Sequence, residues 1–115
     1  MTAYPANTLV KAASVTAPGA GAVVAAITAP PEGVYQVVVN IFLTGTAETQ
    51  LSNLRLRENG ATVFDALPSL STMNVRLVFE QVEVNPGGGN LDIVAIAAAT
   101  AGAIYNVVLI ATRIG

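Results

Sequence analysis

The sequence predicts an all-β protein: a single antiparallel β-sandwich of about eight strands, with jelly-roll-like or Greek-key connections. Three observations support this fold class. Apolar residues recur with a period of two in several runs, as in strands. Turn-forming residues separate these runs at intervals of roughly 8–15 residues, which is typical of sandwiches. No stretch shows the apolar periodicity of an amphipathic helix.

The first half of the chain contains three expected strands, at residues 8–17, 22–27 and 34–43. The sequence Pro18-Gly19-Ala20-Gly21 separates the first two strands, because proline and glycine favour turns. The third strand carries apolar residues on both of its alternating faces. Polar residues 44–52 then form the expected connection between the two sheets.

A β-hairpin is expected around Asn59-Gly60. In residues 54–57 leucine and arginine alternate, so we expect the leucines to point inward and the arginines outward. Asn-Gly supplies the two positive φ angles that a type I′ turn requires. The returning strand, residues 62–67, ends at Pro68 because proline cannot donate a ladder hydrogen bond.

The next expected strand, residues 74–84, changes phase along its length. Its apolar residues up to Phe79 lie on one face, whereas Val82 and the valine that follows it lie on the other. A β-bulge near Glu80-Gln81 would return both groups to the same side, as would a strand that bends between two sheets.

The last two expected strands, residues 91–97 and 104–114, follow a turn at residues 85–90. Residues 93–112 carry no charge and are numerous enough to span a bilayer. The small-residue sequence Ala99-Thr100-Ala101-Gly102 interrupts this stretch, and β-branched residues follow it. Two strands joined by a turn describe it better than one spanning helix, so no membrane partner is expected.

Charge is scarce in this chain of 115 residues. Hydrophobic residues make up 53% and charged residues 10%, where about 25% charged is usual. Burial of much of the surface against other copies, or against a larger partner, would explain this deficit. The absence of His and Cys excludes imidazole bases, thiolate nucleophiles and the usual zinc ligands. We therefore expect no catalytic residue, metal or cofactor, and five scattered basic residues predict no nucleic-acid partner.

The charged residues that remain permit a few specific interactions. Glu80 and Glu83 would point to opposite faces of a regular strand, and only a bulge would bring them together for glycosidase chemistry or calcium binding. We expect them instead to be solvated charges. Arg55 and Arg57 share one face, where they could meet a glycan, a phosphate or a partner's carboxylate, or pair with Asp65 or Glu80.

Two strands have apolar residues on both faces, although one face of an antiparallel sheet in an isolated domain should be solvated. Either these strands are central in a tight core, or another subunit covers their second face. The second interpretation gives a candidate subunit interface, to which the two arginines are added as intersubunit ion-pair formers: Val34, Val38, Phe42, Arg55, Arg57, Val108 and Ile110.

Residues 33–45, the hairpin arm 53–60, the closing segment 99–114 and the opening Met1-Thr2-Ala3-Tyr4-Pro5 resemble small head decoration (cement) proteins of tailed bacteriophages. The resemblance covers most of the chain as a succession of β elements. It implies binding to the major capsid protein on the outside of an assembled capsid, commonly as homotrimers.

The resemblance also implies an N-terminal arm at residues 1–11 that is ordered only on the capsid, before a β-sandwich domain at residues 12–115. Few core-forming residues occur before Leu9. The expected capsid-binding residues of the arm are Thr2, Ala3, Tyr4, Pro5 and Asn7.

We therefore expect a non-enzymatic structural protein of the virion, located on the capsid exterior. The opening residues show no signal-peptide pattern, so synthesis in the host cytoplasm is expected. The alternative is a carbohydrate- or receptor-binding module of a tail fibre or another virion appendage. That alternative requires exposed aromatic side chains for stacking on sugars, and Tyr35 and Tyr105 are the strand aromatics considered for this role.

Overall fold

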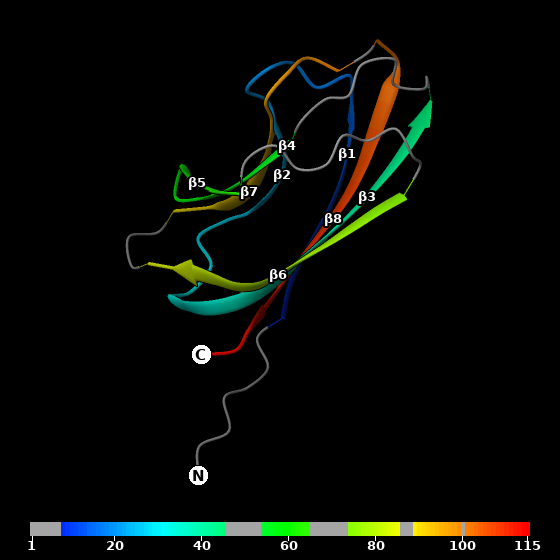
Figure 1. Ribbon diagram of the computed structural model, residues 1–115. Helices are drawn as coiled ribbons and strands as arrows, with labels where there is room; N and C mark the ends of the chain where they lie inside the picture. Colours follow the sequence, from blue (N-terminus) through cyan, green and yellow to red (C-terminus); the bar gives the residue numbers. More distant parts are fainter. Residues whose placement is uncertain (1–7, 46–53, 65–73, 86–88, 100) are drawn as a thin grey trace.

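Two four-stranded antiparallel sheets form a β-sandwich in the computed structural model of the chain (Figure 1). The structure describes residues 8–45, 54–64, 74–85, 89–99 and 101–115, and these ranges contain no helix. The strands are β1 (Thr8–Thr16), β2 (Val23–Ile27), β3 (Gly33–Gly45), β4 (Leu54–Glu58), β5 (Ala61–Phe64), β6 (Asn74–Val84), β7 (Leu91–Ala95) and β8 (Ala103–Arg113).

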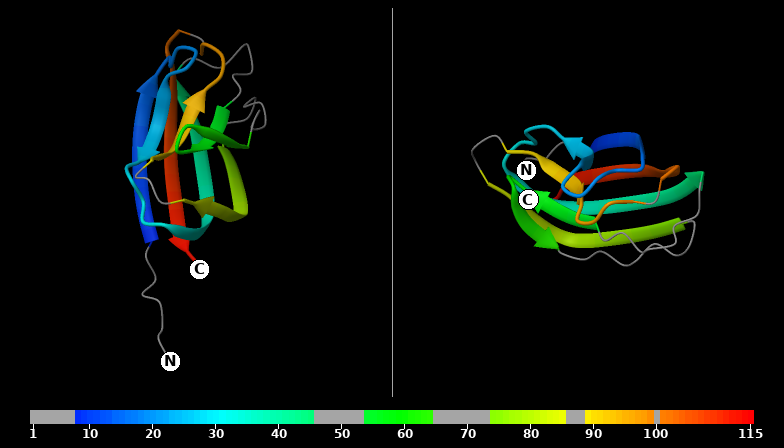
Figure 2. Two further views of the ribbon diagram at one scale, coloured as in Figure 1. Left: turned by 90° about the vertical axis from the view of Figure 1, so that its left-hand side faces the viewer. Right: turned by 90° about the horizontal axis from the view of Figure 1, so that it is seen from above.

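The chain crosses from one sheet to the other at every connection except the β4–β5 hairpin. The first sheet, sheet A, has the order β1-β8-β3-β6, which can be followed from left to right in Figure 2, left. The second, sheet B, has the order β2-β7-β4-β5. Eight strands in these two orders form a jelly roll, which confirms the predicted fold class.

Sheet A begins earlier in the chain than the expected domain boundary. Thr8 pairs with Thr112, and the antiparallel register between β1 and β8 continues without interruption to Thr16. Leu9 already packs against the core, so residues 8–11 belong to the sheet and not to the arm expected at residues 1–11. The arm residues Thr2 to Asn7 lie outside the described residues.

The predicted change of phase in β6 is a β-bulge. Tyr35 of β3 pairs with Val82 and Val37 pairs with Phe79, so two residues of β6, Glu80 and Gln81, face one residue of β3. As a result, the apolar side chains that alternate up to Phe79 and those of Val82 and Val84 all point toward sheet B. Of the two alternatives that the sequence left open, the bulge near Glu80-Gln81 is the one that the structure shows.

The turn between β4 and β5 also follows the prediction. Asn59 and Gly60 have φ angles of 51° and 79°, the two positive values of a type I′ turn. Along β4, the two leucines and Glu58 are buried while the two arginines are partly exposed. The returning strand is β5 (Ala61–Phe64), and residues 65–67 and Pro68 of the expected strand lie outside the described residues.

The core lies between the sheets and consists of alternate residues of each long strand. In β8 every second residue from Ala103 to Ala111 is buried, and β3 has the same pattern from Tyr35 to Leu43. The Tyr35 hydroxyl donates a hydrogen bond of 2.6 Å to the carbonyl oxygen of Pro31, which satisfies its one polar group.

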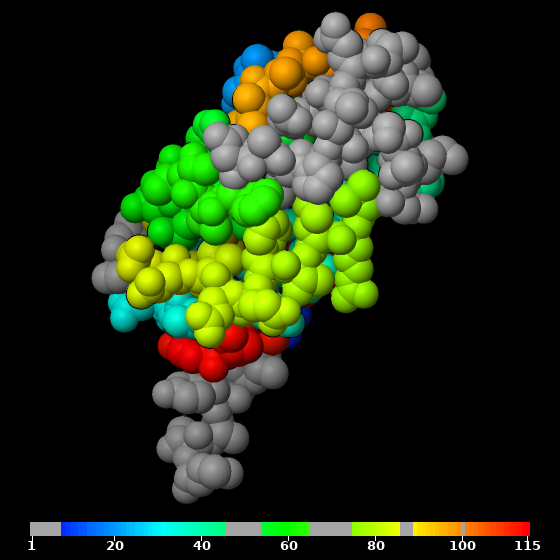
Figure 3. Space-filling view, in the orientation of Figure 1, coloured from blue at the N-terminus to red at the C-terminus, as the bar shows by residue number. Residues whose placement is uncertain are grey.

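One side of the sandwich is closed by aromatic side chains from the two edge strands β5 and β6. The ring centroids of Phe64 and Phe79 lie 5.4 Å apart, and the rings are tilted by 55°. β5 and β6 lie side by side on the surface that faces the viewer in Figure 3. This contact shields the interior where no backbone ladder joins the two sheets.

Two glycines with similar backbone angles provide a test of the close approach between the end of β3 and the segment before β8. Gly45 and Gly60 have φ angles of 75° and 79°, where a side chain costs roughly 1–2 kcal/mol. A Cβ at Gly45 would also collide with the carbonyl oxygen of Gly102, whereas a Cβ at Gly60 would meet no atom within 4 Å. We expect Gly60→Ala to lower the free energy of unfolding by about 1 kcal/mol and Gly45→Ala by at least twice as much. Urea denaturation measures both losses, and equal losses would contradict the collision.

Candidate functional site

The outer face of sheet A, which points away from sheet B, carries an uninterrupted row of aliphatic side chains. Strand register aligns one residue from each of the four strands: Val10, Ile110, Val38 and Val78. We call these four residues the apolar row. Val10 and Val78, at the two ends of the row, are 61% and 44% exposed. Because these four aliphatic residues lie in adjacent strands, they form a contiguous apolar surface, in contrast to apolar residues that are exposed singly.

More polar rows flank the apolar row on both sides. On one side, the register aligns Ala12, Val108, Asn40 and Arg76. On the other side it aligns Thr8, Thr112 and Gln36, and the Gln36 amide nitrogen lies 3.5 Å from a carboxylate oxygen of Glu80. Charge on these three rows is therefore confined to the edge strand β6.

A shallow hollow lies beside the apolar row, over β8, β3 and β6. Its walls include Phe42, which is 41% exposed, together with Val108 and Asn40. Asn106 is held in place because its amide nitrogen donates to the carbonyl oxygen of Phe42 and to the Thr44 hydroxyl, each at 3.0 Å. Its carbonyl oxygen accepts a 2.6 Å hydrogen bond from the Ser14 hydroxyl.

Arg76 also lines this hollow and is exposed. Within the described residues it has no carboxylate at ion-pair distance. An unpaired guanidinium beside apolar surface can accept a carboxylate from outside the chain, with five donors available in a planar arrangement.

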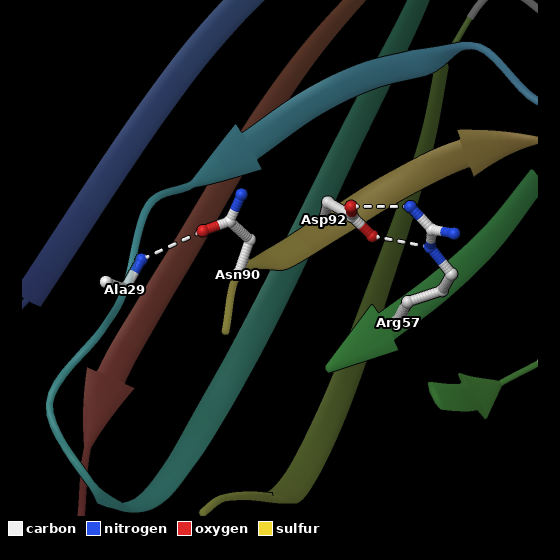
Figure 4. A network of polar contacts seen from close by, with 4 residues as sticks. All are labelled: Ala29, Arg57, Asn90 and Asp92. Atoms are coloured by element: carbon white, nitrogen blue, oxygen red, sulfur yellow. Dashed lines mark hydrogen bonds and ion pairs between the residues drawn. The ribbon is translucent and has the colours of Figure 1, made fainter. Parts of the chain in front are cut away.

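The outer face of sheet B differs because its central charges neutralise each other. Arg57 of β4 and Asp92 of β7 are register neighbours and form a bidentate ion pair, with Nε to Oδ1 at 2.9 Å and Nη2 to Oδ2 at 2.8 Å (Figure 4). The hydrogen bonds that Arg57 donates to Asp92 are the main reason that the pKa of Arg57 is raised. The exposed fraction of Asp92 is 6%.

The ion pair corrects the expected partners of Arg57. Glu80 lies in β6 of the opposite sheet, and Asp65 lies outside the described residues. Asp92 takes the role because β7 is the lateral neighbour of β4 in sheet B. Strand order in a sandwich is set by distant parts of the chain, so the local sequence did not reveal this neighbour.

The structure divides the seven predicted interface residues between two opposite faces. Arg55 and Arg57 lie on sheet B. The other five lie together on the outer face of sheet A, outside the core: Val34, Val38, Phe42, Val108 and Ile110. β3 and β8 are the two central strands of sheet A, but these five side chains are not among the buried core residues, and a second subunit that covers them stays a prediction.

A buried carboxylate, Glu58, is not among the charged residues that the sequence pattern singled out. Glu58 is 7% exposed, and the Asn85 amide nitrogen lies 3.4 Å from its Oε1, while its Oε2 has no hydrogen-bond partner. Near it, Asn90 Oδ1 accepts a hydrogen bond from the Ala29 backbone N–H at 3.1 Å (Figure 4). The inward phase of the preceding leucines was the available signal that Glu58 also points inward.

The described residues form no group of three or more acidic, His or Cys residues that could hold a metal ion. Glu80 and Glu83 are both exposed. Tyr35 and Tyr105 are fully buried and cannot stack on a sugar, which removes the two strand aromatics considered for carbohydrate binding. In the part of the chain that is described, no helix has the length and apolar character needed to cross a membrane.

Comparison with known proteins gives one informative similarity. No protein family and no curated protein matches the sequence. Among solved structures, a chain of the cyanophage Pam1 capsid asymmetric unit is similar in fold, with a TM-score of 0.61 and 17% sequence identity. The similarity covers 100% of this chain and 90% of that chain.

The Arg57–Asp92 ion pair predicts a specific pattern of stabilities. Arg57→Met leaves the buried Asp92 carboxylate without its counter-charge, so we expect a loss of about 2–3 kcal/mol in the free energy of unfolding. Arg57→Met combined with Asp92→Leu removes both charges and should recover most of that loss. Urea denaturation of the two variants measures the difference. A double variant no more stable than Arg57→Met would show that the carboxylate is not stabilised by Arg57.

Proposed function

We propose that this protein is a non-enzymatic structural component of a bacteriophage virion that binds the outer surface of the capsid and stabilises it, as a decoration or cement protein. The observation that carries the proposal is the full-length similarity of its jelly roll to a chain of the cyanophage Pam1 capsid asymmetric unit. The resemblance to head decoration proteins supports the same role.

The surface chemistry also supports this role. The chain has twelve charged residues, five basic and seven acidic, and two of these form the Arg57–Asp92 pair. An apolar face with few charges suits a large static contact, whereas rapid transient encounters benefit from extensive complementary charge. On a capsid, many equivalent contacts act together, so each single contact can be weak.

The partners in this proposal are the major capsid protein and further copies of the chain. A homotrimer is what the resemblance implies, and it stays a prediction. The proposed place of action is the capsid exterior, after synthesis in the host cytoplasm. No catalytic step is included, because the chain has neither His nor Cys to act as base or nucleophile.

One observation favours the alternative, a carbohydrate- or receptor-binding module of a tail fibre or other appendage. The hollow on sheet A brings the exposed Phe42 ring close to the amides of Asn40 and Asn106. An aromatic face beside amide donors and acceptors can bind a sugar. Binding to immobilised glycans that Phe42→Ala abolishes would support this alternative over the capsid role.

The capsid role can be tested with capsids of the encoding phage assembled without this protein. We expect the purified chain to sediment with these capsids in a saturable manner, and to raise the temperature at which they lose their shell structure. Bovine serum albumin at the same concentration controls for trapping in the pellet. Absence of both co-sedimentation and stabilisation would contradict the proposal.

The proposed arm can be tested separately. Because β1 begins at Thr8, deletion of residues 1–6 should leave the free energy of unfolding within about 0.5 kcal/mol of the full chain and abolish capsid attachment. Replacement of residues 2–7 by glycine and serine keeps the length and should also abolish attachment. Attachment retained by both variants would show that the capsid contact lies in the sandwich.

A further inference from the structure

We propose that two copies of this chain pair through the outer faces of sheet A, about a two-fold axis that runs along the apolar row. The inference rests on the self-association included in the proposed function, but it specifies a two-fold dimer in place of the homotrimer that the resemblance implies. It specifies the surface, the partner and the register of the contact.

The geometry of a two-fold axis determines which residues meet. An axis along the row crosses the four strands, so β6 of one copy runs antiparallel over β6 of the other, and the same holds for β1, β8 and β3. Each residue of the apolar row then faces its own counterpart: Val10, Ile110, Val38 and Val78. In each strand, a residue on one side of the apolar row faces a residue of the same strand in the other copy, which lies equally far from the row on its opposite side.

The two-fold rotation brings opposite charges of the two outer faces together. Arg76 and Glu80 lie two residues before and two residues after Val78 in β6. The axis therefore places Arg76 of each copy opposite Glu80 of the other, and the contact contains this pair twice. No carboxylate of the described residues lies at ion-pair distance from Arg76, and the contact supplies one.

The neighbouring strands are complementary as well. In β3, Asn40 faces Gln36 of the second copy, and two amides can exchange hydrogen bonds. In β8, Val108 faces Thr112, which offers a methyl group. The hollow beside the row receives the longer Gln36 and Glu80 side chains of the second copy. No like charges meet on these rows.

The size of the face is sufficient for a specific contact. In β8, β3 and β6, nine residues at about 3.3 Å give a length of about 30 Å, and in β1 the five residues centred on Val10 give about 16 Å. With strands about 4.8 Å apart, a pair of such faces buries about 1,000 Å² in total. Specific interfaces need at least about 1,000 Å², so the dimer is expected to form at the weak end of the range.

Sheet B offers no equivalent surface among its described residues. Its exposed apolar residues Val23, Val63 and Phe64 lie on β2 and β5, which are the two opposite edges of the sheet. Between these edges, the Arg57–Asp92 pair lies across β4 and β7. Within the described ranges, only the outer face of sheet A combines a contiguous apolar centre with self-complementary charge.

The first test uses sedimentation equilibrium to measure the mass of the free protein in solution, at protein concentrations from about 10 μM to about 1 mM. We expect a reversible transition from 11.7 kDa to twice that mass. Val78→Glu places two carboxylates face to face on the axis and should weaken dimerisation by about 100-fold or more. The matched control is Val63→Glu, because Val63 is a valine of similar exposure, 39%, on the edge strand of sheet B.

Charge reversal tests the register of the contact. Arg76→Glu and Glu80→Arg should each weaken dimerisation at least tenfold, because each places like charges opposite one another. The two substitutions together restore opposite charges and should return the affinity toward that of the original chain. Both sites are exposed, and circular dichroism checks that the fold is intact.

Several outcomes would overturn the inference. These are a mass of 11.7 kDa at every concentration, a trimer as the assembled species, equal effects of Val78→Glu and Val63→Glu, or a double reversal no better than the single ones. Capsid co-sedimentation is measured on the same variants. If Val78→Glu is monomeric and still binds capsids, the dimer stands and capsid binding does not need it. If the original chain dimerises but never binds capsids, the capsid role fails alone.

Discussion

The pairing of β3 with β8 is the constraint on which the rest of this structure depends. The two strands run antiparallel in unbroken register from Tyr35 and Arg113 to Gly45 and Ala103, at the centre of sheet A. Because side chains alternate between the faces of a strand, this register decides at once which residues form the core and which form the outer face. A slip of one residue in either strand would expose Tyr35 or Tyr105 and bury Asn40 or Asn106.

The β-bulge in β6 extends this division of faces to the edge of the sheet. Without the extra residue, Val82 and Val84 would point outward, and the outer face would lose its regular arrangement of rows. With it, Val82 is 2% exposed in the core, while Glu80 remains outward beside Gln36. The same local irregularity therefore completes the core and leaves on the surface the carboxylate needed for a self-complementary face.

Local sequence was sufficient to predict the strands and the Asn59-Gly60 turn, because each depends on periodicity or turn chemistry within one segment. It offered the bulge in β6, and the outward phase of Val38 and Ile110, each as one of two alternatives. It was not sufficient for Asp92 as the partner of Arg57, or for Val10 and Val78 as members of the apolar row. Those relationships cross between strands that are distant in sequence. They become visible only when the sheet order β1-β8-β3-β6 and its register are known.

The small number of charged residues in the chain makes the outer face of sheet A easier to bury. Removing a charge from water costs far more than removing a methyl group, so a face with few charges can be buried with little desolvation penalty. Such a face gains little from electrostatic steering, and its association is correspondingly slow. That combination suits a contact that forms once and persists in an assembly. It also explains why charge on the three central rows is confined to the edge strand β6, where the ion pairs of the dimer would lie at the rim and help to fix its register.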